Sequence, residues 1–226
     1  MLWDSCVGKN RKGGKPVNLD REKLRLYAVT DRECLIPGKT LPEAVEEVLQ
    51  AGVKCIQLRE KQGDMDQIRK EAYRVKELCD RFGALFIIND YPQLALEVGA
   101  SGVHVGQEDM EIEKAREILG DSFLIGGSAH NVAEALKAQE AGADYIGCGA
   151  VFGSATKLDA GVLPLTELER ICDSVSIPVV AIGGINKNNI GRLSGIKIAG
   201  AAVVSALFGA EDPGREARNL MEQIKA

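Results

Sequence analysis

Short apolar runs alternate along the chain with longer segments in which apolar residues recur at helical spacing, and this alternation repeats eight times after residue 23. Short apolar runs are typical of buried parallel strands, and amphipathic segments are typical of the helices that cover them. The predicted strands are residues 24–29, 54–58, 85–88, 102–105, 123–126, 144–148, 179–182 and 201–204. The predicted helices are residues 41–51, 64–82, 92–98, 111–119, 132–141, 165–173, 188–194 and 213–224.

Capping residues mark the boundaries of these helices. Thr40 and Pro42 begin the first one, and a glycine follows most of the others. Eight strand–helix units without a surplus strand predict an α/β fold, a single (β/α)8 TIM barrel at residues 23–226, preceded by a flexible leader at residues 1–22. An open doubly wound sheet is the alternative, but the glycine-rich turn that usually follows its first strand is absent.

The composition narrows the class of protein. The 226 residues fit one large domain, and the net charge of −5 argues against a general nucleic-acid binder. No apolar run reaches the roughly 18 residues of a membrane span, and the N-terminus lacks the apolar region of a secretory signal. The six cysteines include no Cys-x-x-Cys pair, so we expect reduced thiols in a cytoplasmic protein and no zinc site. The sequence does not specify the oligomeric state, and a homo-oligomer stays open.

Acidic residues follow the third and fourth predicted strands. Asp90 ends the segment Phe-Ile-Ile-Asn-Asp, and Glu108 and Asp109 follow Gly-Val-His-Val-Gly-Gln. The carboxyl ends of parallel strands meet at one rim, where α/β proteins bind ligands. Asp90 and Asp109 are therefore candidate ligands of Mg²⁺, a hard cation that prefers oxygen. The alternative from these residues alone is that both are helix N-caps.

Basic residues follow the second predicted strand. Gln57, Arg59 and Lys61 occupy alternating positions, and alternation in extended backbone puts the three side chains on one side. Two cations and an amide on one side form a binding site for phosphate or pyrophosphate. A solvated charged loop is the alternative.

A second anion site is expected at the seventh and eighth loops. Gly183 and Gly184 would let backbone N–H groups approach a ligand closely, and these two loops are the usual phosphate site of this barrel. The remaining candidate residues at strand ends are Asn89, Ser128, Ser154, Thr156, Lys157, Val204 and Ser205.

Each of the two histidines has a structural alternative to a functional role. His104 lies within the fourth predicted strand, where it could be a core residue inside the barrel. His130 is expected to begin the fifth helix, where capping is the alternative to chemistry. No Ser-His-Asp or Cys-His pairing is evident.

The combination of a basic site with two carboxylates indicates one kind of chemistry. Carboxylates repel a pyrophosphate unless a cation bridges the two, and Mg²⁺ held by Asp90 and Asp109 would do so. This arrangement suits the departure of pyrophosphate, with metal and cations stabilising the leaving group. The second anion site would hold a phosphorylated acceptor.

From Leu24 to about Phe208 the chain resembles the thiamine-phosphate synthase family. The matching segments all lie at predicted strand ends and occur in the family's order. Each segment is short, and their combination is specific. They are Gln57-Leu-Arg-Glu-Lys61, Ile88-Asn-Asp90, Gly102-Val-His-Val-Gly-Gln-Glu-Asp109, Ser128-Ala-His130, Asp144-Tyr-Ile-Gly147, Thr156-Lys157, Ile182-Gly-Gly-Ile185 and Val203-Val-Ser205.

The resemblance implies a transferase that condenses 4-amino-5-hydroxymethyl-2-methylpyrimidine pyrophosphate with a thiazole phosphate, giving thiamine phosphate and pyrophosphate. It implies a dissociative substitution assisted by Mg²⁺, in which pyrophosphate leaves and the thiazole nitrogen attacks a pyrimidinylmethyl cation. It assigns Mg²⁺ to Asp90 and Asp109. It assigns the pyrimidine pyrophosphate to Gln57, Arg59, Lys61, Asn89, Ser128 and Lys157. It assigns the thiazole phosphate to Ser154, Thr156, Gly183, Gly184, Val204 and Ser205.

The sixth loop departs from the family pattern. It reads Gly149-Ala-Val-Phe-Gly-Ser-Ala-Thr-Lys157, so that Ala150 and Gly153 replace two prolines and Ser154 replaces a threonine. We expect a less rigid loop, with an effect on acceptor affinity.

Two other functions are alternatives. A thiazole tautomerase on the same scaffold would have no reason to keep Arg59, Lys61, Asp90, Asp109 and Lys157 together. A non-catalytic barrel that binds a phosphorylated ligand would have no need of the acidic pair.

Overall fold

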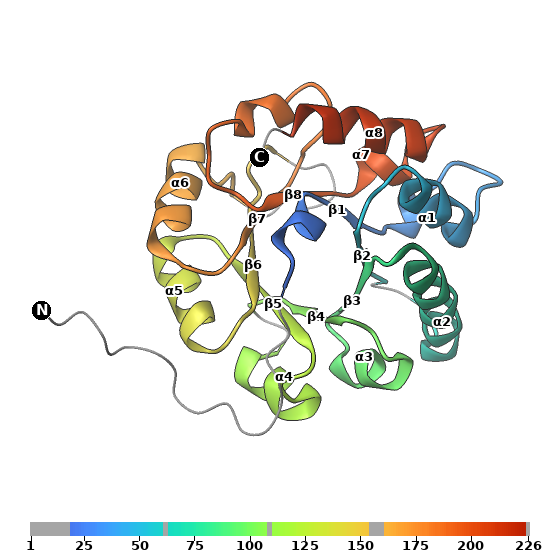
Figure 1. Ribbon diagram of the computed structural model, residues 1–226, viewed down its shortest axis with the longest axis horizontal. Helices are drawn as coiled ribbons and strands as arrows, with labels where there is room; N and C mark the ends of the chain where they lie inside the picture. The colour runs from blue at the N-terminus through green and yellow to red at the C-terminus, as the bar shows by residue number, and fades with distance from the viewer. Residues whose placement is uncertain (1–18, 61–62, 108–109, 154–160, 225–226) are drawn as a thin grey trace, which may run out of the picture.

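The computed structural model describes residues 19–60, 63–107, 110–153 and 161–224. Its eight parallel strands pair in sequence order, and β8 pairs with β1 to close the barrel (Figure 1). The predicted TIM barrel is confirmed. The strands are β1 (Leu26–Val29), β2 (Cys55–Leu58), β3 (Leu85–Asn89), β4 (Gly102–Val105), β5 (Leu124–Ala129), β6 (Tyr145–Cys148), β7 (Val179–Ile182) and β8 (Gly200–Val203).

Helices surround the barrel as an outer ring (Figure 1). The α-helices are α1 (Leu41–Gln50), α2 (Met65–Phe82), α3 (Pro92–Val98), α4 (Ile112–Leu119), α5 (Val132–Glu140), α6 (Leu165–Ser174), α7 (Ser205–Phe208) and α8 (Pro213–Gln223). In the described part of the chain, three 3₁₀ turns accompany them: η1 (Arg21–Leu24), η2 (Arg32–Cys34) and η3 (Ile190–Leu193). None of the helices in the described ranges is long and apolar enough to cross a membrane.

Local sequence explains where helices begin and end. Thr40 and Glu43 form a capping box at the start of α1, with Pro42 in its first turn. Gly83 and Gly99 end α2 and α3 in the left-handed conformation, which glycine adopts without steric cost.

The predicted helix at 188–194 is wrong in type, because the structure has only the short 3₁₀ turn η3 there. Asparagine side chains bind the backbone ahead of this turn: Asn186 N donates to Asn189 Oδ1 at 2.9 Å, and Asn188 N donates to Asn186 Oδ1 at 2.9 Å. Such local bonds compete with the regular helical pattern. The short helix α7 was not predicted.

The fifth strand is longer than predicted. It continues to Ala129, so Ser128 lies within the strand and not after it. The expectation that His130 begins the fifth helix is also wrong, because α5 begins at Val132 with Asn131 as its N-cap. The predicted strand ends at Gly126, but Gly127 also belongs to β5, and a Cβ at Gly127 would fall 2.8 Å from the side chain of Ile112 of α4.

Apolar side chains form two clusters, one on each face of the sheet. Leu26 and Ala28 of β1 point outward into the large cluster beneath the helices, whereas Tyr27 and Val29 point inward into a smaller cluster. The same alternation runs around the barrel, as a parallel sheet requires. It therefore determines which side chains can face a ligand inside the barrel mouth.

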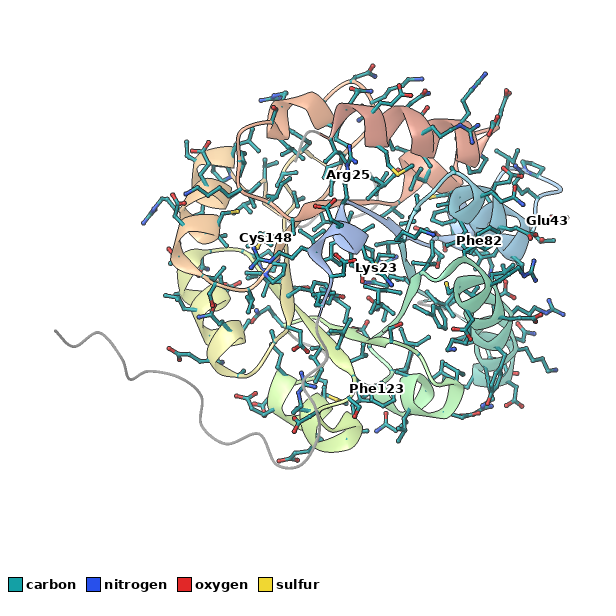
Figure 2. The ribbon with its side chains drawn as sticks, viewed as in Figure 1. Lys23, Arg25, Glu43, Phe82, Phe123 and Cys148 are labelled. Carbon is teal, nitrogen blue, oxygen red and sulfur yellow. The ribbon has the colours of Figure 1, made fainter. Side chains whose placement is uncertain are left out.

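Basic side chains fasten the chain that precedes β1. Lys23 and Arg25, labelled in Figure 2, lie on the segment that crosses the centre of the ring. Lys23 Nζ donates to Gly83 O at 3.1 Å, and Arg25 donates to the carbonyls of Met221 and Ile224 at 2.9 Å each. These bonds join the start of the barrel to the ends of α2 and α8. They lie at the end of the barrel opposite to the strand carboxyl ends, where residues contribute to stability.

Candidate active site

A pocket opens at the carboxyl ends of the strands, where the sequence predicted the site. It brings together eight of the predicted site residues: Gln57, Arg59, Asn89, Ser128, Gly183, Gly184, Val204 and Ser205. Its lining also includes Tyr27, His104, His130, Tyr145 and Gly147, among others. Five predicted residues, Lys61, Asp109, Ser154, Thr156 and Lys157, lie outside the described part of the chain.

Strand alternation explains why these side chains share the pocket. Gln57 lies two residues after the inward-facing Cys55, and Asn89 two residues after the inward-facing Ile87. Ser128 follows Leu124 by four residues and has the same orientation. Because side chains alternate with a period of two, all three point into the barrel.

Five polar side chains form a hydrogen-bonded chain inside the barrel. Gln57 Nε2 donates to Tyr27 OH at 2.8 Å, and Tyr27 OH is 2.8 Å from Tyr145 OH. Tyr145 OH is 3.3 Å from His104 Nδ1, and His104 Nε2 is 3.1 Å from Ser128 Oγ. The chain connects two predicted site residues, Gln57 and Ser128, through three residues that were not assigned a role from the sequence.

Glycines make room for this chain. A Cβ at Gly126 would fall 2.3 Å from Tyr145 Cζ and 2.5 Å from His104 Nδ1. A Cβ at Gly147 would fall 3.2 Å from His104 Cε1. The imidazole of His104 therefore occupies a space that larger residues on β5 and β6 would close.

The two tyrosines are neutral. Burial raises the pKa of Tyr27 and of Tyr145 well above the usual value. The neighbouring Tyr145 raises the pKa of Tyr27 further. Both side chains are almost fully buried. Nothing local in the sequence distinguishes these two tyrosines, since aromatic residues are ordinary in strands.

Arg59 is held by the first loop. Its backbone N–H donates to Thr30 Oγ1 at 3.0 Å, and its guanidinium lies 3.9 Å from Asp31 Oδ2. The side chains of Arg59 and Asp31 are only 18% and 14% exposed. A largely buried arginine beside one carboxylate keeps donors for a second, anionic partner.

Asp90 has an uncommon backbone conformation. Its φ is +63°, which makes it the one non-glycine residue with positive φ in the described ranges. Its backbone N–H donates to His104 O at 2.9 Å, and Asn89 Nδ2 donates to its carboxylate. The N-cap of α3 is Tyr91. The capping alternative for Asp90 is therefore wrong. Strained conformations of this kind occur mostly at functional sites, which favours a functional role for Asp90.

The donor chemistry at Asp90 fits a hard cation. A carboxylate at a strand end is an oxygen ligand, and Mg²⁺ often takes one or two protein carboxylates and completes its shell with water and phosphate. Within the described ranges no group of three His, Cys, Asp or Glu side chains is arranged to hold a metal. Asp109, the second predicted ligand, lies outside those ranges.

The seventh loop packs against the sixth. Gly183 and Gly184 have φ of +105° and +65°, and a Cβ at Gly184 would fall 2.3 Å from Phe152 O. Val151 N and Phe152 N donate to Ile182 O and Gly183 O at 2.9 and 3.0 Å. These glycines thus allow close approach of a neighbouring loop as well as exposing their own backbone to the pocket.

The start of the altered sixth loop is fixed in place. Ala150 is 9% exposed, and its carbonyl accepts a hydrogen bond from Leu163 N at 2.6 Å. Arg192 lies over the ring of Phe152, 5.1 Å from its centroid. Ordering of residues up to Gly153 therefore comes from packing and hydrogen bonds, in place of the prolines that the family pattern would supply.

His130 lies at the pocket edge. Its side chain is 51% exposed, and Nδ1 is 3.0 Å from Glu134 Oε2. Its backbone N–H donates to the same carboxylate oxygen at 2.8 Å. These contacts stabilise the turn before α5 and leave His130 at the entrance, away from the hydrogen-bonded chain.

Known proteins resemble this chain over most of its length. The family model of thiamine monophosphate synthase matches residues 26–207. A thiamine-phosphate synthase of Fusobacterium nucleatum is 46% identical over 91% of this chain and all of its own length. One of Methanobrevibacter smithii is 43% identical over 92% of this chain and 98% of its own. The solved structure of a thiamine phosphate pyrophosphorylase from Pyrococcus furiosus is 41% identical, with a TM-score of 0.84 over 90% of this chain and 96% of that one. The chain belongs to the thiamine monophosphate synthase family.

Proposed function

We propose that this protein catalyses the thiamine-phosphate synthase reaction. It joins the pyrimidinylmethyl group of 4-amino-5-hydroxymethyl-2-methylpyrimidine pyrophosphate to the nitrogen of a thiazole phosphate, and it releases pyrophosphate. The observation that carries this proposal is a pocket in which Arg59 and Asn89 face the glycine-rich seventh loop across the barrel mouth. A cationic side and a backbone-amide side suit a substrate pair with two separate phosphate groups.

The basic side of the pocket would hold the pyrimidine pyrophosphate. Arg59 is positioned by Thr30 and Asp31, so its guanidinium can bind phosphate oxygens with little further loss of conformational freedom. Gln57, Asn89 and Ser128 offer amide and hydroxyl groups deeper in the barrel. Lys61 and Lys157 are assigned to the same substrate as proposals from the family pattern.

The opposite side would hold the thiazole phosphate. Gly183 and Gly184 expose backbone at the end of β7, and Val204 and Ser205 follow β8 directly. Loops seven and eight are the usual phosphate site of TIM barrels. Ser154 and Thr156 of the sixth loop are assigned to this substrate on the family pattern alone.

Asp90, with Asp109, would hold Mg²⁺. When bound there, Mg²⁺ supplies positive charge for the departing pyrophosphate. The protein's own part is to bind the leaving group through Arg59 and to orient the pyrimidine against neutral tyrosines within the barrel. A buried, uncharged floor formed by Tyr27 and Tyr145 also excludes water from a cationic carbon.

The test mixes both substrates with the purified protein and Mg²⁺ and measures thiamine phosphate by chromatography. Product should require both substrates and disappear when a chelator removes the metal. Arg59→Ala should lower kcat/KM about 10- to 100-fold, since a hydrogen bond to a charged group contributes about 1.5–3 kcal/mol. Arg81→Ala is the matched control, because Arg81 is 54% exposed in a surface ion pair with Glu46. Folded protein that forms no product from these substrates would overturn the proposal.

The remaining expectations follow from this activity. The partners would be the two small substrates, with no nucleic acid or membrane. A cytoplasmic location and a homo-oligomeric state stay predictions. The thiazole tautomerase alternative has less support, because the 46% identical relative is itself a thiamine-phosphate synthase.

A further inference from the structure

The hydrogen-bonded chain from Gln57 to Ser128 has a direction that can be worked out from its donors. The amide nitrogen of Gln57 can only donate, and it donates to Tyr27 OH. Tyr27 then gives its own hydrogen to Tyr145, and Tyr145 gives its hydrogen to His104 Nδ1. His104 Nδ1 is thus an acceptor, so the proton of the neutral ring is on Nε2, which donates to Ser128 Oγ.

The opposite direction satisfies fewer groups. If Tyr145 donated to Tyr27, the Tyr27 oxygen would accept two hydrogen bonds, and its own hydrogen would be left with the sulfur of Cys55, a weak acceptor. Tyr27 is only 2% exposed, and a buried hydroxyl that exchanges an oxygen acceptor for a weak sulfur acceptor is less stable. The direction that begins at Gln57 gives every donor of the chain a partner up to the Ser128 hydroxyl.

We propose that this chain holds His104 in the Nε2–H form and so makes Ser128 a hydrogen-bond donor to the bound ligand. Ser128 Oγ already accepts from His104, and its own hydrogen is free to point into the pocket that it lines. The hydroxyl groups of Tyr27 and Tyr145 are then positioning groups, which act on the ligand through His104 and Ser128. Ser128 is the end of the chain that meets the ligand.

The barrel wall keeps the rings in this arrangement. The space beside His104 is bounded by Gly126 and Gly147, and Tyr27 and Tyr145 rings pack with centroids 6.0 Å apart. The rings of His104 and Tyr145 lie 5.6 Å apart. Close packing on both sides limits rotation of the imidazole, so its two nitrogens keep their separate partners.

The first experiment reads the His104 tautomer in the ligand-free protein. Long-range ¹H–¹⁵N spectra at alkaline pH, where imidazoles are neutral, distinguish the protonated nitrogen from the other one. The protein contains two histidines, His104 and His130, so the His130 signals supply the internal reference. We expect Nε2–H for His104. An Nδ1–H form in the unaltered protein would overturn the proposal, whatever the enzyme's activity.

Variants test which residues set the tautomer. Gln57→Glu replaces the amide nitrogen that donates to Tyr27 by a carboxylate oxygen that can only accept, which should reverse the hydrogen-bonded chain and move the His104 proton to Nδ1. Tyr145→Phe should leave a mixture of the two forms. Tyr73→Phe is the matched control, since Tyr73 is 48% exposed on α2, and it should change nothing. A His104 spectrum that is the same in all three variants would contradict the proposal.

A double-mutant cycle tests the effect on the ligand, and this part rests on the proposed function. Ser128→Ala and Tyr145→Phe should each lower kcat/KM about tenfold, the effect of one hydrogen bond. Together they should lower it little more than Ser128→Ala alone, because Tyr145 acts through Ser128. A multiplicative loss of about a hundredfold would overturn the role of Tyr145. Absence of turnover in the unaltered protein would count against the proposed reaction, and the tautomer result would stand.

Discussion

Gly126 and His104 are cross-strand partners on β5 and β4, and the imidazole occupies the space that a side chain at Gly126 would fill. A Cβ there would fall 2.5 Å from His104 Nδ1. The absence of a side chain on one strand thus permits a polar residue on the next. This pairing explains why a glycine lies in the middle of a strand, where it otherwise weakens the sheet.

Gly126→Ala should displace His104 and Tyr145 and break the hydrogen-bonded chain. We expect the free energy of unfolding to fall by about 2 kcal/mol from overpacking, and turnover to fall at least tenfold. Urea denaturation and the synthase assay measure the two effects. Gly191→Ala is the control, because Gly191 has open space around it and lacks a positive φ. The free energy of unfolding of this variant should differ from that of the unaltered protein by less than about 0.5 kcal/mol. Equal behaviour of the two variants would contradict the steric argument.

Substitutions of Asp90 should separate strain from function. At φ +63°, Asp90→Ala should lower the free energy of unfolding by about 1 kcal/mol, whereas Asp90→Gly should keep or raise it, because glycine adopts this conformation freely. Both variants lose the carboxylate, so both should lose most turnover and its dependence on Mg²⁺. Thermal denaturation and Mg²⁺ titrations of activity check this. Full activity in Asp90→Gly would mean that the carboxylate has no part in catalysis.

The barrel and its strand ends could be predicted from the sequence because the spacing of apolar residues and the positions of capping residues and glycines indicate the same elements. Apolar runs, capping residues such as Thr40 and closing glycines such as Gly83 are local signals, and the structure has a strand or an α-helix at every predicted element except the helix at 188–194. The strand-end rule then placed Gln57, Arg59 and Asn89 at one mouth without knowledge of any contact.

The hydrogen-bonded chain could not be predicted in this way. Tyr27 and Tyr145 lie in apolar strands, and nothing local distinguishes a tyrosine that bonds across the barrel from one that fills the core. Their pairing depends on β1 and β6 facing each other through the barrel interior. The role of Gly126 could not be predicted for the same reason, since it is set by side chains of neighbouring strands.

Buried thiols and phenols should make the protein less stable at alkaline pH. Burial raises the pKa of Cys79 and Cys148 to about 12, above the ordinary thiol value of about 8.5. The folded state therefore holds these protons more tightly than the unfolded state. Their contribution to stability is complete below about pH 8.5 and is lost as the pH rises toward 12. Tyr27 and Tyr145 act in the same direction at higher pH.

Urea midpoints at pH 7.5, 9 and 10 check this expectation, and they should fall steadily. Cys148→Ala removes one of the groups and should flatten the decline. The matched control is an exposed phenol, Tyr73→Phe, which should leave the decline as it is. A midpoint that rises with pH across this range would contradict the assigned burial effect.

Gly184→Ala should weaken binding of the thiazole phosphate more than that of the pyrimidine pyrophosphate. Gly184 has φ +65°, and a Cβ there would fall 2.3 Å from Phe152 O and 2.5 Å from Gly153 O, so the sixth and seventh loops would have to separate. We expect a rise of about tenfold or more in KM for the thiazole phosphate, with a smaller change for the other substrate. The comparison is Gly161→Ala, where a Cβ meets nothing within 4 Å and φ is not positive. Steady-state kinetics with each substrate varied in turn measures both constants. Equal effects on the two KM values would mean that the seventh loop supports the whole pocket and does not bind the acceptor in particular.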